Sequence, residues 1–265
     1  FLKACSKGQQ KVIEMMLNSE LSKDELINAK DFKGRSGLVL ASNSNHASVV
    51  RLLLKDWSFK VDKVDDHLKL CFMEACKEGR DEIVRILMSL PDSNELISHA
   101  DTMGKTGLME ASSGTNLEVV KTLLSHPNMH YFINKKDRNG MTAFLHACNN
   151  GRVKVIEVFL DPEFFNVAKV MNASHSAFIL AYHEKQIEVM GILVPHLTNL
   201  DEFKHVFELA SKSNDTSTVT TLLSWTSHHE NLKDLKEPIV TYTFQYGTLH
   251  QATTILEDDN FNDVI

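Results

Sequence analysis

Two stretches in the middle of the chain share one pattern: Asp101–Leu124 (DTMGKTGLMEASSGTNLEVVKTLL) and Asp137–Leu160 (DRNGMTAFLHACNNGRVKVIEVFL). Each begins with Asp-x-x-Gly and continues to an alanine, Ala111 or Ala147. Apolar residues then follow 8, 9, 12 and 13 positions after that alanine. Because such positions form one stripe of an α-helix, each stretch predicts a turn, a short helix with the alanine, and a second helix with one buried face.

The same spacing recurs along the whole chain. Its anchor residues are Ala4, Ala41, Ala75, Ala111, Ala147, Ala181, Ala210 and, in a degenerate copy, Thr243. One such unit cannot bury its apolar stripe alone, so neighbouring units stack and share a core. We therefore expect an all-α solenoid of stacked helix-turn-helix units with protruding turn loops, and a single array over residues 1–265. The predicted repeats lie near 1–34, 35–69, 70–104, 105–140, 141–175, 176–204 and 205–237, and a cap covers 238–265.

The turns between the helices have residues suited to them. Gly or Asn occurs where the short helix must turn into the second one, at Gly79, Gly151, Asn45 and Asn214, and both residue types tolerate a left-handed conformation. The Asp-x-x-Gly loops are followed by a Ser or Thr that can cap the next short helix, namely Ser36, Thr106 and Thr142. Three cysteines, Cys5, Cys76 and Cys148, directly follow an anchor alanine. We interpret them as small apolar residues at a tight contact between helices.

Turn, short helix, tight turn and longer helix at a period near 33 residues resemble the ankyrin repeat. The family pattern reads roughly D-x-x-G-x-T-P-L-H-x-A-A-x-x-G-x-x-x-x-V-V-x-x-L-L. The chain departs from it where the family has Pro, for example at Gly107 and Ala143, and where the family has His, at Met109 and Leu145. The family's Thr–His hydrogen bonding at this turn is therefore not expected. The resemblance is specific for the fold and says little about function.

Composition limits the possible functions. The chain has 265 residues, of which 43% are apolar, and a net charge of −7. The acidic balance disfavours nucleic-acid binding, which needs a basic surface. No apolar run reaches the ~18–20 residues of a membrane span, and the chain does not open with a basic and then apolar signal segment. Four cysteines without a CxxC motif favour a reducing, cytoplasmic location. A start at Phe1 rather than Met leads us to expect a segment of a longer protein.

No motif points to catalysis, a cofactor or a metal. His126 and His130 have i, i+4 spacing, but Pro127 breaks the helix that this spacing requires. The zinc motif H-E-x-x-H, the phosphate-binding glycine loops and the G-x-S-x-G elbow do not occur. We therefore predict a chain without catalytic, cofactor-binding or metal-binding residues.

The resemblance implies a concave binding surface, made from the turn tips and the exposed faces of the short helices. The residues predicted to contact a partner are Phe32, Lys33, Arg35, Lys77, Met103, Lys105, Arg138, Asn139, Met141 and Asn149. Aromatic, Met and Arg side chains are enriched in the centres of interfaces. The basic tip residues Lys33, Arg35, Lys105, Lys135, Lys136 and Arg138 favour a protein or peptide partner with an acidic segment.

Several functions remain open at this point. The leading hypothesis is a protein–protein interaction module that acts without catalysis. The alternative is a regulatory or targeting segment of a larger multidomain enzyme, ion channel or secreted effector. An enzyme within these residues predicts a concave pocket with clustered titratable groups. A nucleic-acid binder predicts steep salt dependence, against the acidic balance. Nothing in the pattern indicates an oligomeric state.

Overall fold

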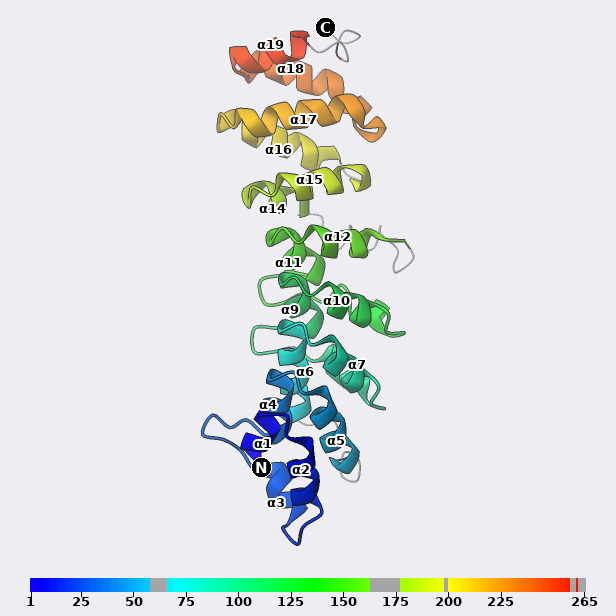
Figure 1. The fold of residues 1–265 in the computed structure, drawn as a ribbon. Coiled ribbons are helices and arrows are strands. Elements are labelled where there is room, and N and C mark those ends of the chain that lie inside the picture. Colours follow the sequence, from blue (N-terminus) through cyan, green and yellow to red (C-terminus); the bar gives the residue numbers. More distant parts are fainter. Residues whose placement is uncertain (58–65, 163–176, 198–199, 258–260, 262–265) are drawn as a thin grey trace. The chain divides into compact units, whose positions relative to one another are not determined.

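The computed structural model describes residues 1–57, 66–162, 177–197, 200–257 and 261 (Figure 1). Within these ranges the chain forms helices and turns and no β-strand, as expected for an all-α fold. The helices group into two compact units, Phe1–His146 (unit 1) and Ala147–Ile265 (unit 2). Each unit is described by itself, and the single array over 1–265 stays a prediction. The predicted boundary between 175 and 176 lies outside the described residues.

Unit 1 contains four helix pairs. They are α1 (Leu2–Ser6) with α2 (Gln10–Leu17), α4 (Gly37–Asn43) with α5 (Ala47–Trp57), α6 (Asp66–Lys77) with α7 (Asp81–Met88), and α9 (Gly107–Ser113) with α10 (Leu117–Leu124). Short helices follow some of the second helices: α3 (Lys23–Asn28), α8 (Ser93–Ser98) and the 3-10 helix η1 (Met129–Tyr131). Helix α11 (Ala143–Asn149) contains the residue at which the two units divide.

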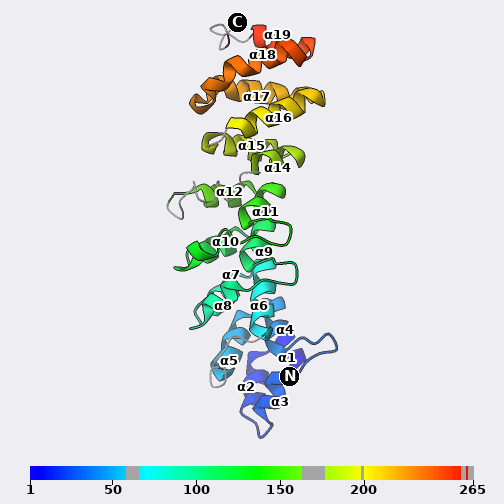
Figure 2. The same cartoon turned by 180° about the vertical axis from the view of Figure 1, so that it is seen from behind.

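The pairs of unit 1 stack in two layers. The first helices α1, α4, α6 and α9 pack on one another in order, and α2, α5, α7 and α10 form the second layer. Figures 1 and 2 show the two layers side by side from opposite directions. Between them lies the predicted apolar stripe, which in α10 consists of Val119, Val120, Leu123 and Leu124, each at most 4% exposed. Burial of this stripe is the main source of the stability of the stack.

Unit 2 also consists of packed helices, and two of them, α16 and α17, have 13 residues each. Its elements are α12 (Val153–Leu160), α14 (Ala177–His183), α15 (Ile187–Leu193), η2 (Val194–His196), α16 (Leu200–Lys212), α17 (Thr216–His228), η3 (Glu230–Leu235), α18 (Lys236–Tyr246) and α19 (Leu249–Glu257). Helices α14, α16 and α18 pack in order, and α17 packs against α19. In its core the rings of Phe178 and Phe203 stack with centroids 5.7 Å apart.

The local predictions for anchors, turns and caps are confirmed. All eight anchor residues lie in the first helix of a pair and are buried. The residues between the paired helices have positive φ: +71° at Gly79, +64° at Gly151, +59° at Asn45 and +56° at Asn214. Each predicted cap accepts a hydrogen bond from a backbone N–H three residues later: Ser36 from Val39 (3.4 Å), Thr106 from Met109 (3.4 Å) and Thr142 from Leu145 (3.2 Å).

Neighbouring repeats of unit 1 are not interchangeable. The first and third contain F-x-x-A-C-x-x-G, at Phe1–Gly8 and Phe72–Gly79, whereas the second and fourth begin their first helix with Gly37 and Gly107. A Cβ on Gly107 would lie 2.7 Å from Cε1 of Phe72. The glycine therefore makes room for the ring of the preceding repeat, and the chain alternates between two kinds of repeat.

The anchor cysteines take part in the same contact. A Cβ on Gly107 would lie 2.9 Å from Sγ of Cys76, and one on Gly37 would lie 2.9 Å from Sγ of Cys5. Both cysteines are fully buried, in agreement with the predicted tight packing. Asn116 adds a polar link, since its Nδ2 donates to the carbonyl oxygens of Cys76 (3.3 Å) and Lys77 (2.7 Å).

Candidate protein-binding surface

Three hairpins of unit 1 are held by the aspartates of the Asp-x-x-Gly loops. Oδ1 of Asp101 accepts the backbone N–H groups of Met103 and Lys105, both at 2.8 Å. Asp31 and Asp137 make the equivalent two bonds at 2.8–2.9 Å. The turns close at Gly34, Gly104 and Gly140, whose φ angles are +76°, +80° and +76°, where only glycine is unstrained. These bonds fix the shape of each tip before any partner arrives.

The hairpins project on the same side of unit 1, to the left in Figure 1 and to the right in Figure 2. Two of them are joined directly, because the backbone N–H of Arg138 donates to the carbonyl oxygen of Met103 at 3.0 Å. The tips of the second and third hairpins, which contain Met103 and Arg138, therefore form one continuous edge.

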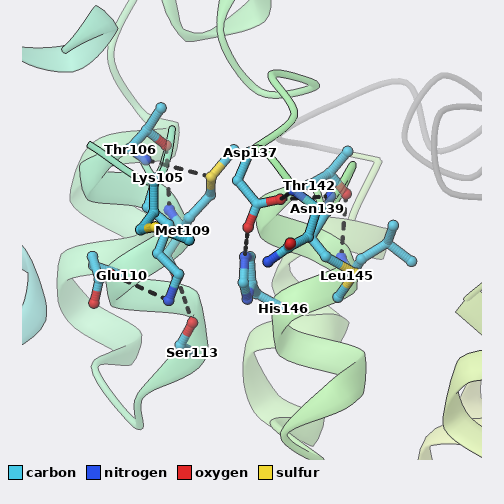
Figure 3. A network of polar contacts seen from close by, with 12 residues as sticks. Lys105, Thr106, Met109, Glu110, Ser113, Asp137, Asn139, Thr142, Leu145 and His146 are labelled. Carbon is cyan, nitrogen blue, oxygen red and sulfur yellow. Dashed lines mark hydrogen bonds and ion pairs between the residues drawn. The ribbon is translucent and has the colours of Figure 1, made fainter. Parts of the chain in front are cut away.

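In two of the three hairpins the second carboxylate oxygen of the aspartate binds a side chain of the same chain. Oδ2 of Asp31 accepts from Arg35, with Nε at 2.8 Å and Nη2 at 2.7 Å. Oδ2 of Asp137 lies 2.9 Å from Nε2 of His146, and the Asp137 side chain is 1% exposed (Figure 3). Burial acts to raise the pKa of Asp137, but the bonds from Met141 and His146 outweigh it and leave that pKa below its usual value.

The contact with His146 was missed at the level of sequence. His146 lies one residue after Leu145, which occupies the family's His position, so the pattern alone assigns it no role. A signal existed: His146 precedes the anchor Ala147 on the short helix, and Asp137 begins the adjoining hairpin. The bond ties the hairpin to the middle of α11, a contact for which the sequence analysis named no residue.

The predicted apolar contacts are presented at the tips to different degrees. Phe32 is 91% exposed, and Nζ of Lys33 lies 5.7 Å from the centroid of its ring. Met103 is 49% exposed, whereas Met141 is half-buried. Arg138 and Asn139 are exposed on the third hairpin. Exposed large apolar side chains on fixed loops are the feature that distinguishes this edge.

Half of the predicted basic tip residues form a described ion pair or hydrogen bond through their charged group. Arg35 is bonded to Asp31 as described above. Nζ of Lys105 lies 3.4 Å from Glu110 (Figure 3), and Nζ of Lys135 donates to the carbonyl oxygen of Ser98 at 2.7 Å. The other three, Lys33, Lys136 and Arg138, are exposed. The positive character of the tips is therefore weaker than the residue count indicates.

The two predicted contacts on short helices lie in different units. Lys77 is exposed at the end of α6 and lines a cavity of about 450 Å³ in unit 1. The residues that line this cavity are Asp66, Lys69, Leu70, Met73, Glu74, Lys77, His99, Asp101 and Glu110. Asn149 is half-buried on α11 and belongs to unit 2. Lys77 therefore borders the same cavity as Asp101 of the second hairpin, and Asn149 is described with the other unit.

The histidines and cysteines have structural surroundings. Nε2 of His126 lies 3.4 Å from Oγ of Ser93, and Nδ1 of His126 accepts a hydrogen bond from the backbone N–H of Asn128 at 3.2 Å. Burial raises the pKa of the Cys5 thiol to about 11 and that of Cys148 further. In the described part of the chain, no three His, Cys, Asp or Glu side chains lie close enough to hold a metal ion. None of the described helices combines the length and apolar character needed to cross a bilayer.

Comparison with known proteins agrees with the repeat geometry. No curated protein matches the sequence. The model of the family described as ankyrin repeats (3 copies) matches residues 1–96 and 108–204. These matches cover more than half of the chain and include the hairpins of Asp31 and Asp137 and the buried anchors of α1 to α14, whereas the hairpin of Asp101 falls between the two matched ranges. The chain therefore belongs to the ankyrin-repeat family.

Proposed function

We propose that this chain is a protein-interaction module whose partner covers the hairpin tips and the adjoining exposed face of α6. Ankyrin repeats generally mediate contacts between proteins. The observation that supports this surface is the exposure of Phe32 (91%) and Met103 (49%) on loops fixed by hydrogen bonds of 2.8–2.9 Å. Because these loops are already ordered, binding loses little conformational entropy.

The chemistry of the tips favours a partner with an apolar centre flanked by acidic residues. Phe32 and Met103 supply the apolar contact, and Lys33, Lys136 and Arg138 supply exposed positive charge next to it. Exposed charge of this kind mainly accelerates association and is screened by salt. We expect binding to weaken moderately at high ionic strength rather than to vanish, since the apolar contact is insensitive to salt.

The experiment compares the chain with a variant altered at the tips. The whole chain serves as bait for proteins from a cell lysate, beside Phe32→Glu/Met103→Glu/Met141→Glu. Phe244→Glu/Leu256→Glu is the control, because it makes the same chemical change at 50% and 53% exposed positions of unit 2. Circular dichroism confirms that all three are folded.

We expect a protein retained by the wild-type chain and by the control but lost from the tip variant. The dissociation constant of that protein, measured with purified components, should rise at least about a hundredfold, since introduced carboxylates at three apolar contacts are left without partners. Equal retention by all three chains would rule out the tips as the binding surface.

A further inference from the structure

The cavity beside Lys77 has an origin in the sequence. Helix α6 has 12 residues, whereas α4 and α9 have 7 each. Its lining residues, Asp66, Lys69, Leu70, Met73, Glu74 and Lys77, recur at intervals of three and four and so occupy one helical face. The opposite wall consists of His99, Asp101 and Glu110, from the next hairpin and α9. The longer helix therefore meets the hairpin across a space of about 450 Å³, within the size range of ligand pockets.

The lining is apolar at depth and acidic at its sides. Met73 is 9% exposed and Leu70 is 43% exposed. Four carboxylates face two lysine ammonium groups around the cavity. Burial, reinforced by Lys69, lowers the pKa of His99, which keeps its imidazole neutral near pH 7. The charge of the cavity at neutral pH is therefore negative.

Asp101 differs from the other two hairpin aspartates. Oδ2 of Asp31 holds Arg35, and Oδ2 of Asp137 holds His146. Among the described residues, no cation occupies the second oxygen of Asp101. The position equivalent to Arg35 is Lys105, whose Nζ lies 3.4 Å from Glu110 instead. Asp101 lines the cavity instead.

The second hairpin also lacks a counterpart of His146. His146 lies four residues after the capping Thr142, and the residue four positions after Thr106 is the carboxylate Glu110. Glu110 also lines the cavity, and its side chain is 18% exposed. Glu74, across from it on α6, makes no side-chain hydrogen bond or ion pair within the described structure. The carboxylates of Glu74, Asp101 and Glu110 thus border a space that Lys69 and Lys77 also line. Of these three carboxylates only that of Glu110 has a described ion pair, with Lys105.

We propose that this cavity accepts the side chain of a lysine or arginine from the bound protein, and this proposal rests on the proposed function. The methylene groups of such a side chain would lie along Leu70 and Met73, and its cationic head would reach Glu74, Asp101 and Glu110. Long basic side chains combine apolar stems with charged heads in this way. The cavity adds a specific basic position to a partner whose other contacts with the tips are apolar and acidic.

The test uses random dodecapeptides displayed on phage as the probe and the whole chain as the target. Selected peptides should contain a lysine or arginine at one recurrent position. Replacing that residue by the neutral isostere norleucine should weaken binding about tenfold or more, because a partly buried charge pair is lost.

A double-mutant cycle assigns the effect to the cavity. The cavity variants are Glu74→Gln and Glu74→Gln/Glu110→Gln, and the single change alters a side chain with no described contact to lose. Glu118→Gln is the matched control, since Glu118 lies on α10 and is 64% exposed. We expect the basic and norleucine peptides to bind the double variant about equally, and the control to discriminate as the wild type does.

The outcomes separate this proposal from the proposed function. Two results would overturn the cavity proposal: selected peptides without a recurrent basic residue, or a basic residue whose replacement weakens binding equally in the wild type and the double variant. The proposed function would stand in either case if Phe32→Glu/Met103→Glu abolishes binding of the selected peptides. Failure to select any peptide would count against both proposals.

Discussion

Replacing Gly107 by alanine tests the packing between neighbouring repeats. The new Cβ would lie 2.7 Å from Cε1 of Phe72 and 2.9 Å from Sγ of Cys76. Both distances are roughly 1 Å below an ordinary contact of about 3.5–4.0 Å. Because both facing side chains are fully buried, neither can move aside without disturbing the core. Overpacking of this kind costs about 1–3 kcal/mol.

The effect of alanine on the backbone at this position would instead raise the free energy of unfolding. Alanine is the native residue at the equivalent position of the next repeat, Ala143, which is buried. Where the conformation is compatible, a Gly→Ala replacement stabilises a protein by about 0.4–1 kcal/mol through the unfolded state. The two effects together predict that Gly107→Ala lowers the free energy of unfolding by about 1–2 kcal/mol. Urea denaturation followed by circular dichroism measures this difference.

Two further variants separate the clash from other causes. At Gly37 the facing ring is that of Phe1, which is only partly buried, so Gly37→Ala should cost less than Gly107→Ala. The combination of Gly107→Ala with Phe72→Leu should cost less than the sum of the two single changes, because the smaller side chain relieves the contact. A Gly107→Ala chain more stable than the wild type would refute the packing argument.

Three other properties follow from the structure. Asp137→Asn should lose stability at pH 7 but little at low pH: the lowered pKa of Asp137 stabilises the fold above its unfolded value of about 3.9, and this contribution disappears as pH falls through the folded pKa. The urea midpoints of the wild-type chain and of Asp137→Asn at pH 7 and pH 3 measure this effect. A difference between the two chains that is the same at both pH values would contradict it. Cys5 and Cys148 should react with a disulfide reagent only after unfolding, because both are fully buried with raised pKa values; rapid labelling of the native chain would contradict this. Phe32→Glu should change the free energy of unfolding by less than about 0.5 kcal/mol, since the ring is 91% exposed. A larger loss in the same denaturation assay would assign Phe32 to the fold rather than to binding.

The helices and turns could be predicted from sequence because their causes are local. Each anchor is followed by an apolar stripe with helical spacing, and residues such as Gly79 and Thr106 have one preferred place in a turn or at a helix start. Local signals of this kind recur in every repeat, so a weak one, as at Thr243, is supported by its neighbours.

The specific side-chain contacts depend on how the chain folds and were not predicted from the sequence. The sequence alone does not show that Gly107 makes room for the ring of Phe72, because that contact appears only when the two repeats pack. The pairing of Asp137 with His146 required the fold of the hairpin onto α11. Counting charges also overstated the basic character of the tips, since composition does not show that Lys105 turns back to Glu110.

Site-specific photo-crosslinking tests the central claim most directly. A photoreactive phenylalanine analogue replaces Phe32 in one chain and Met103 in a second, and Glu118 on α10 in a control chain. Each chain is produced in cells and irradiated. The surface proposed here predicts an adduct with the same protein from positions 32 and 103 and none from 118. An adduct from 118 alone would contradict it and place the partner on the layer of second helices.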